Sequence, residues 1–218
     1  MAPKKPKSTA KPAPAKSGAK AGKAASAARK PEKPVRERAV AAALDLAARM
    51  GWDMVTMADI ADKAHIGLSE LADIFDGKDD VLTAYGRQVD RRVLEAFSGA
   101  DDGAGERDRL FEILMERMDI LNEDREAVQS ILKSFLPDPK QAVISLPHLA
   151  RSMAWMMEAA GLSTSGVKGA VRVFGLTIVY LTVLRHWMKD ESEDLSVTMA
   201  ALDRALGHAE KCANTFML

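Results

Sequence analysis

The sequence has few of the residues that build disulfide-linked or β-rich proteins. It contains a single cysteine, Cys212, so no disulfide bond can form within the chain, and one thiol fits a reducing compartment. Aromatic residues make up only 5% of the chain, although hydrophobic residues make up 47%. The core must therefore be built from Ala, Leu, Val, Met and Ile, a composition that favours helices over strands.

Long hydrophobic runs are also lacking. The uncharged stretch "VFGLTIVYLTVL" at residues 173–184 has twelve residues, whereas about 17–25 are needed to span a bilayer. A helix that is apolar on every side is buried instead, either in a core or across a contact between subunits. The N-terminal region has no apolar segment of about 7–15 residues, which excludes a secretory signal. We therefore expect a cytoplasmic protein that is not an integral membrane protein.

The patterns that mark enzymes and metal sites are missing as well. The four histidines, at positions 65, 148, 186 and 208, lie far apart, and no carboxylate stands at metal-ligand spacing from them. There is no G-x-S-x-G, no Walker loop, no G-x-G-x-x-G and no Ser/His/Asp set. We expect neither an enzyme nor a bound metal or cofactor.

Residues 1–34 differ in character from the rest of the chain. They carry nine Lys, one Arg and one Glu, a net charge of +9, so the remaining residues sum to −9 and the whole chain to zero. Because they contain six of the nine prolines and no Leu, Ile, Val, Phe or other aromatic residue, they cannot form a core and are predicted to be disordered. The spaced Lys, Ala and Pro residues look like the tails of histone H1-type proteins. Ten cations on such a tail bind nucleic acid without sequence preference through counterion release. The alternative is a tail that only improves solubility.

From Val35 onward hydrophobic residues recur at helical spacing, which predicts an all-α fold. Thr56 is expected to cap the second helix, Gly51 to end the first, and "SGADDGAGE" (98–106) to form a loop. Pro147 is expected to divide one helical segment. The predicted helices are Val35–Met50, 57–64, Leu68–Phe75, one starting at Lys78, Arg107–Asn122, Arg125–Phe135, His148–Ala160, Thr164–Lys189 and Asp194–Asn214.

Two motifs surround the third predicted helix. The first is T-x-x-x-I-A-x-x-A, and the second is F-x-x-K-x-x-x-L. Together they resemble the N-terminal helix-turn-helix of the TetR family of transcriptional regulators, over about residues 35–85. The resemblance implies a helix-turn-helix head at 35–82 and a helical ligand-binding and dimerisation body at 83–218. The motif residues are Thr56, Ile60, Ala61 and Ala64 in the first, and Phe75, Lys78 and Leu82 in the second.

In the TetR family the third helix lies in the major groove of an operator. The resemblance implies that DNA contacts come from Thr56, Gly67, Leu68, Ser69, Ala72 and Lys78. The chain departs from the family in having His65 where a glycine is usual, and Ala72 where an aromatic residue, mostly Tyr, contacts phosphate. Between Asp53 and Asp80 there are eight acidic residues against two Lys, and carboxylates that face phosphates repel them. Helical spacing places Glu70 and Asp73 on one side, so they could point away from the groove.

The C-terminal half carries a second resemblance. The stretch "YLTVLRHWMKDESEDLSVTMAALDRAL" (180–206) looks like the end of the TetR-like lipid-binding protein of coenzyme Q biosynthesis. That resemblance implies a lipid in the pocket and assistance to a hydroxylase. Two functions are therefore carried forward: a regulator whose operator affinity is controlled by a small hydrophobic ligand, and a lipid-binding accessory protein of ubiquinone biosynthesis with a degenerate head. A protein that only compacts DNA is a third possibility.

Methionines and aromatic residues cluster in the predicted body. They form either an ordinary core or a pocket for a hydrophobic ligand, because methionine adapts to both. The candidate pocket residues are Met115, Met118, Met153, Met156, Phe174 and Tyr180.

The last predicted helix carries a stripe at 4-3-4 spacing. With the uncharged helix before it, the stripe suggests a four-helix contact in a homodimer, as in TetR-like proteins. Packing within one chain is the alternative. The stripe residues are Leu195, Met199, Leu202 and Leu206.

Overall fold

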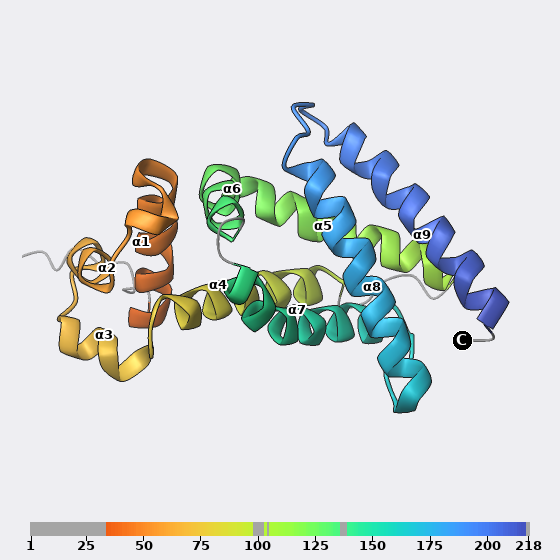
Figure 1. Cartoon of the computed structure of the whole chain (residues 1–218), viewed down its shortest axis with the longest axis horizontal. Coiled ribbons are helices and arrows are strands. Elements are labelled where there is room, and N and C mark those ends of the chain that lie inside the picture. Colours follow the sequence, from red (N-terminus) through yellow and green to blue (C-terminus); the bar gives the residue numbers. More distant parts are fainter. Residues whose placement is uncertain (1–33, 98–102, 104, 136–138, 217–218) are drawn as a thin grey trace, which may run out of the picture. The chain divides into compact units, whose positions relative to one another are not determined.

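The computed structural model describes residues 34–97, 103, 105–135 and 139–216. Across these residues the chain forms nine α-helices and one short 3-10 helix, with no strand, which confirms the all-α prediction (Figure 1). The predicted disordered tail and most of the predicted loop at 98–106 lie outside the described residues. The elements are α1 (Val35–Met50), η1 (Trp52–Met54), α2 (Met57–Ala64), α3 (Leu68–Ile74), α4 (Lys78–Ala96), α5 (Glu106–Glu123), α6 (Arg125–Ser134), α7 (Pro139–Ala159), α8 (Gly166–Trp187) and α9 (Ser196–Phe216).

Helices α1 to α3 pack around a small hydrophobic core. Their buried side chains include Ile60 and Leu71, which are fully covered, and Phe75 just after α3. His65 joins α2 to α3 and lies in the left-handed backbone region, with φ 55° and ψ 50°. Its N–H donates a hydrogen bond to the Asp62 carbonyl. This tight link sets α3 at an angle to α2, so the two form the predicted helix-turn-helix (Figure 1).

Helix α4 belongs to two cores. Val81 and Ala84 pack in the core of α1 to α3, whereas Val89 and Val93 pack in the core of the following helices. The predicted boundary between residues 82 and 83 therefore falls inside one continuous helix.

Helix α6 also contributes to the core of α1 to α3. Its Ala127 and Ile131 are buried there, and its Ser130 hydroxyl accepts a hydrogen bond of 2.9 Å from the Trp52 backbone N–H. The head core is thus completed by a helix that follows α4 and α5 in the chain.

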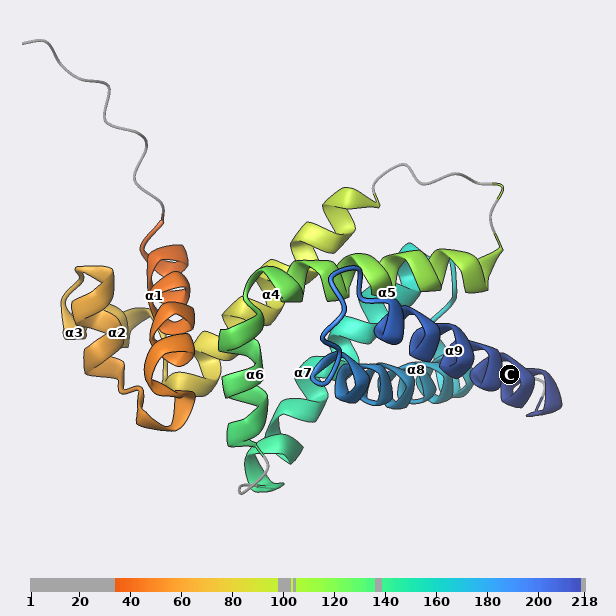
Figure 2. The same ribbon diagram turned by 90° about the horizontal axis from the view of Figure 1, so that it is seen from above.

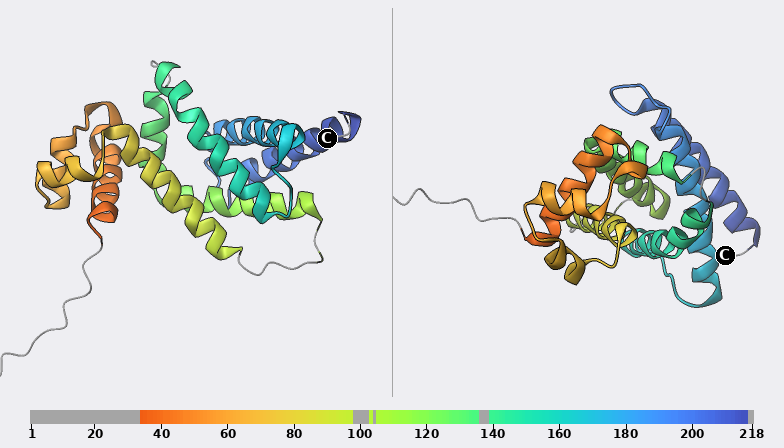
Figure 3. Two further views of the ribbon diagram at one scale, coloured as in Figure 1. Left: turned by 90° about the horizontal axis from the view of Figure 1, so that it is seen from below. Right: turned by 60° about the vertical axis from the view of Figure 1, so that its left-hand side comes forward.

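The second core is formed by α4, α5, α7, α8 and α9. Helices α8 and α9 lie side by side along most of their length (Figures 1 and 2), and α4 runs beside α7 (Figure 3). Met118, Met153 and Met156 are fully buried where these helices meet. The flexible methionine side chain fills irregular apolar space, which explains its frequency in a core with few aromatic residues.

Helix α7 corrects one prediction. Pro147 does not divide the segment, because α7 continues through it from Pro139 to Ala159. Pro147 is exposed, so the hydrogen bond that its missing N–H cannot make lies on the solvent side. The following turns are held in place by burial of Met153, Met156 and Met157, and this packing outweighs the local cost of the proline.

The turn between α8 and α9 is organised by the buried carboxylate of Asp190. Its Oδ2 accepts hydrogen bonds from the Thr198 N–H (2.7 Å) and hydroxyl (2.6 Å), and its Oδ1 accepts bonds from the Ser192 N–H (3.0 Å) and hydroxyl. Burial alone would raise the pKa of Asp190, but these hydrogen bonds lower it to about 2. The carboxylate therefore holds the first turn of α9 against the turn that leads into it.

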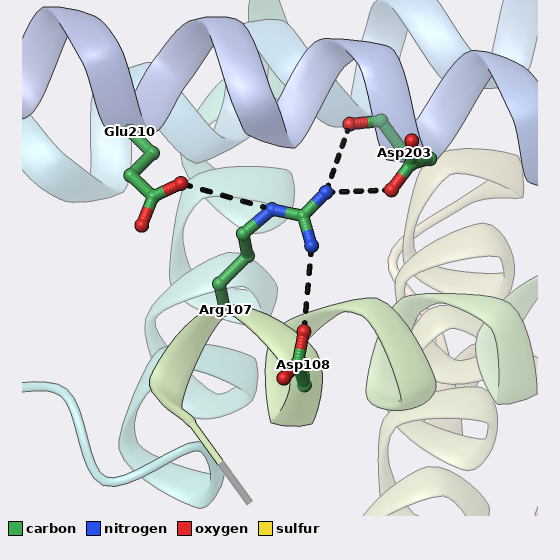
Figure 4. Close-up of polar contacts among 4 residues, drawn as sticks. All are labelled: Arg107, Asp108, Asp203 and Glu210. Atoms are coloured by element: carbon green, nitrogen blue, oxygen red, sulfur yellow. Dashed lines mark hydrogen bonds and ion pairs between the residues drawn. The ribbon is translucent and has the colours of Figure 1, made fainter.

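An ion pair joins the start of α5 to α9. The Arg107 guanidinium contacts the Asp203 carboxylate at 2.5 Å, donates to its carbonyl at 3.3 Å, and lies 3.8 Å from Glu210 (Figure 4). Asp108 on α5 itself is also within 3.3 Å. Because the partners are largely exposed, this cluster mainly sets the register between the helices and adds little stability.

Candidate nucleic-acid interface and ligand cavity

The exposed side of α3 is the candidate nucleic-acid interface. Gly67, Leu68, Ser69 and Ala72 are all exposed, and Leu68 shows 52% of its surface to solvent. Leu71 is fully buried and anchors the opposite side of the helix in the head core. Gly67, which precedes α3, and the three α3 residues predicted to face DNA are thus all accessible.

Acidic side chains lie on this same surface. Asp73 is exposed and stands one helical turn after Ser69, so the two side chains are neighbours on the side opposite Leu71. Glu70 is also exposed, next to that side. At least one carboxylate therefore lies among the residues predicted to face DNA, where it opposes the approach of phosphate.

Thr56 caps α2, as predicted, through a reciprocal pair with Asp59. The Asp59 N–H donates to the Thr56 hydroxyl at 3.2 Å, and the Thr56 N–H and hydroxyl donate to the Asp59 carboxylate at 2.9 and 2.6 Å. These bonds from Thr56 lower the pKa of Asp59. A phosphate at this helix start would meet the carboxylate that already occupies it.

Lys78 lies at the start of α4 but is held inside the head. Its ammonium donates a hydrogen bond of 2.6 Å to the Trp52 carbonyl and lies 4.6 Å from the centre of the Trp52 ring. Burial lowers the pKa of Lys78. The side chain thus ties η1 to α4, and it would have to leave the Trp52 carbonyl to reach a phosphate.

A cavity of about 660 Å³ lies between helices α4 to α8. That volume is in the range of small-molecule sites. Its interior is mainly apolar, and five helices contribute to it, including the α4 helix that is shared with the head core. The apolar lining residues are Leu82, Val89, Leu121, Val128, Ile131, Leu132, Phe135, Leu146, Leu149, Trp155, Leu181 and Leu184.

A buried polar cluster forms one side of the cavity and joins four helices. Arg117 of α5 is 5% exposed; it donates to the Asp90 carboxylate of α4 and, through Nε, to the Tyr180 hydroxyl of α8 at 3.2 Å. Ser152 of α7 donates to the same Asp90 oxygen at 2.5 Å. Burial alone would lower the pKa of Arg117, but interaction with Tyr180 and Asp90 raises it, so the guanidinium stays charged.

Tyr85 adds a second polar contact to the cavity wall. Its hydroxyl donates to the Asp124 carboxylate at 3.1 Å, and its ring packs against both cores. Burial, with Asp124 beside it, raises the pKa of Tyr85, so the phenol stays protonated.

Of the predicted pocket residues, only Tyr180 lines the cavity. Met115, Met118, Met153 and Met156 are buried in the core instead, and Phe174 is 67% exposed on α8. The cavity is lined by leucines and by polar residues of α4 and α7 that the methionine pattern did not indicate. The sequence did contain one indication of this cavity wall, a series of hydrophobic residues at helical spacing on α4. The series is Leu82, Tyr85 and Val89.

The predicted dimer stripe, which begins at Leu195 just before α9 and continues along that helix, points mostly inward. Leu195, Leu202 and Leu206 are buried in the core of the chain, and of the four residues only Met199 is substantially exposed. For those three residues the structure shows the alternative, packing within one chain.

An exposed apolar stripe does occur, on α8. Its members are separated by four, three, four and three residues, so they follow one side of the helix. By length and composition alone, α8 could cross a membrane. It packs on α7 and α9, and 39% of its most apolar 18 residues are buried. The stripe consists of Val167, Val171, Phe174, Ile178 and Leu181.

No group of three or more His, Cys, Asp or Glu side chains in the described part of the chain has the geometry to hold a metal ion. Cys212 is exposed on α9.

Solved structures of TetR-family transcriptional regulators are similar to this chain. A TetR regulator from Nitrosomonas europaea is 28% identical, over 81% of this chain and 98% of that chain, with a TM-score of 0.67. A TetR regulator from Rhodococcus sp. RHA1 is 16% identical over 80% and 95%, with a TM-score of 0.59. FadR of Thermus thermophilus, a TetR-family repressor solved in complex with lauroyl-CoA, is 18% identical over 80% and 93%, with a TM-score of 0.54. No protein-family model and no curated protein matches the sequence.

Proposed function

Because the described part of the chain has the fold of the TetR-family transcriptional regulators, we propose that the protein is a DNA-binding regulator whose operator affinity is controlled by a small hydrophobic ligand. The observation that carries this proposal is the position of α4. Val81 and Ala84 in its first turns pack in the head core, and residues of the same helix from Asp79 to Asp90 line the cavity. A ligand that favours one position of α4 therefore also favours one position of α3, which is the differential binding that regulation requires.

The proposed regulator is a homodimer that pairs through α8. The exposed stripe on α8 supplies an apolar surface that a second copy would cover, and Val197 and Met199 at the start of α9 are exposed as well. Two-fold symmetry then presents two α3 helices to two half-sites. The residues of this stripe replace the α9 leucines as the proposed contact.

Residues 1–34 supply non-specific affinity for DNA in this proposal. Their net charge of +9 neutralises phosphates without reading sequence. They offset the repulsion between phosphate and the carboxylates of the head.

The test is DNA binding by fluorescence anisotropy with the full chain and with residues 35–218, on the upstream region of its own gene and on scrambled DNA, across a salt series. We expect both proteins to prefer the upstream region, and the full chain to bind both DNAs more tightly, with a steeper dependence on salt. Binding that is equal on both DNAs, or that disappears with the tail, would contradict sequence-specific regulation.

A second function is supported by Asp73. A carboxylate on the outermost side of α3 suits a head that no longer reads DNA, and the stretch 180–206 resembles the lipid-binding accessory protein of ubiquinone biosynthesis. Mass spectrometry of organic extracts from the purified protein distinguishes the two functions. A co-purified isoprenoid lipid, together with no preference for upstream DNA, supports the accessory protein.

A further inference from the structure

The charged groups that line the cavity are unevenly placed. In the interior, Arg117 is neutralised by Asp90, and Ser152 completes the pair. Arg87 of α4 and Arg151 of α7 also line the cavity, but both are exposed, so they lie at its opening to solvent. The interior thus has no uncompensated charge, and the opening carries two guanidinium groups.

The two exposed arginines belong to two helices that meet at one contact. Ser152 touches Asp90 and so joins α7 to α4 at this point. Arg87 precedes Asp90 by three residues, less than one helical turn, and Arg151 directly precedes Ser152. Both cations therefore lie within one helical turn of the same contact and line the same cavity.

Neither of these arginines has a hydrogen bond or an ion pair with any residue that the structure describes. The other acidic residue that lines the cavity, Asp79, has a partner of its own. It also precedes Arg87 by two turns on α4, about 12 Å along the helix axis. The opening near Arg87 and Arg151 is therefore positively charged.

We propose that the cavity binds an anionic amphiphile, with its apolar body among the leucines of α4 to α8 and its carboxylate or phosphate head group held by Arg87 and Arg151. The guanidinium group suits both head groups, because it donates two parallel hydrogen bonds to either. The inference deepens the proposed regulator, since it assigns the chemical class of the ligand in that same cavity. It does not depend on DNA binding.

The test compares four ligands with the same ten-carbon chain, below the concentrations at which they form micelles. Decanoate and decyl phosphate are anionic, decan-1-ol is neutral, and decyltrimethylammonium is cationic. Trp155 lines the cavity and is 51% exposed, whereas Trp52 and Trp187 are buried, so a blue shift of tryptophan emission reports occupation of the cavity. Calorimetry on the full-length protein gives the dissociation constants.

We expect at least one of the two anionic ligands to bind about tenfold more tightly than decan-1-ol, the effect of a pair of charge-assisted contacts at a partly solvated site. The double variant Arg87→Gln/Arg151→Gln should lose this preference and keep its affinity for decan-1-ol. The tighter of the two anionic ligands identifies the head group as carboxylate or phosphate.

The matched control is Arg204→Gln, which removes an exposed guanidinium on α9 outside the cavity and leaves residues 1–34 unchanged. The control should bind like the unmodified protein. Equal binding of decan-1-ol, tighter binding of the cationic ligand, no binding of any ligand, or an anion preference that survives the double substitution overturns the proposal. If decanoate binds and the affinity for DNA does not change, the proposed regulation by ligand is contradicted, whereas the proposed class of ligand is still supported.

Discussion

His65 occupies a backbone conformation that favours glycine. Its φ of 55° lies in the left-handed region, where a side chain with a Cβ is disfavoured by about 1–2 kcal/mol. The absence of the glycine that is usual in TetR proteins at this position therefore has a local cost in the turn between α2 and α3.

We predict that His65→Gly raises the free energy of unfolding by about 0.5–1 kcal/mol, because removal of the Cβ strain outweighs the extra backbone entropy of glycine in the unfolded chain. Urea denaturation followed by circular dichroism measures the change. Ala72→Gly on exposed α3 is the control and should lower the free energy of unfolding, because glycine is a poor helix former. A loss of stability in His65→Gly would show that the histidine makes a stabilising contact in the turn.

Asp190 sets a pH dependence of stability. Its pKa is lowered to about 2 in the folded protein, from an ordinary value of 3.8. A carboxylate with a lowered folded pKa stabilises fully above its unfolded value, and this contribution is lost as the pH falls from about 4 towards 2. We predict that Asp190→Asn lowers the free energy of unfolding by about 2 kcal/mol at pH 7 and flattens its decline below pH 4.

Thermal unfolding between pH 7 and pH 2.5 measures this difference, with Asp73→Asn on the exposed side of α3 as control. The Asp73 variant should keep the slope of the unmodified protein. If Asp190→Asn unfolds with an unchanged pH profile, the hydrogen bonds from Ser192 and Thr198 do not hold the ionised carboxylate.

At the scale of the element, α3 has a shape that suits the major groove and a charge that opposes it. We predict that Glu70→Gln/Asp73→Asn tightens DNA binding about three- to tenfold at 50 mM salt, and less at 200 mM, because the removed repulsion is screened by ions. Anisotropy with DNA from the upstream region and with scrambled DNA measures both affinities. The control is Glu193→Gln, an exposed acid in the turn before α9. Weaker binding of the upstream DNA by the double variant would mean that these carboxylates accept hydrogen bonds from bases.

The stripe on α8 predicts the oligomeric state. We expect the full-length protein to be a dimer at micromolar concentration, and Phe174→Glu to convert it to a folded monomer, since a charge at the centre of an apolar contact lacks a partner there. Sedimentation velocity measures the mass, and circular dichroism checks the fold. Met54→Glu, which changes another exposed apolar residue on η1, should leave the dimer intact. A Phe174→Glu protein that remains dimeric would place the contact elsewhere.

Elements also show what the sequence could and could not predict. Helix α1 was predicted with both ends correct, and α2 with its Thr56 cap, because periodicity and capping are local properties. The side that α8 leaves exposed was not predicted. Residues 173–184 are apolar on all sides, so the sequence contains no polar contrast to mark a face. The α9 stripe had such contrast, but the same period describes packing against α8 and packing against a second chain.

At the scale of the whole molecule, the Arg117 cluster joins four helices around one guanidinium. We predict that Asp90→Asn lowers the free energy of unfolding by about 3 kcal/mol, because it leaves Arg117 buried and charged without its partner. Equilibrium denaturation in urea measures this value.

The control for Asp90→Asn is Glu123→Gln, which breaks an exposed ion pair with Arg92 between the same two helices. That change should cost less than about 1 kcal/mol. A double variant, Asp90→Leu/Arg117→Met, should recover most of the loss, since an apolar pair needs no compensation. Equal effects of Asp90→Asn and Glu123→Gln would mean that water reaches the Arg117 guanidinium.

The contribution of α6 to the core of α1 to α3 also decides how the protein can be engineered. Helix α6 lies about 40 residues beyond the predicted boundary at residue 82. It supplies Ala127 and Ile131 to this core, and its Ser130 accepts the hydrogen bond from Trp52. A chimaera that exchanges only residues 35–82 for those of another regulator would set a foreign surface against this helix. An exchange of the first three helices therefore also requires the matching side of α6, because the head does not have a complete core without that helix.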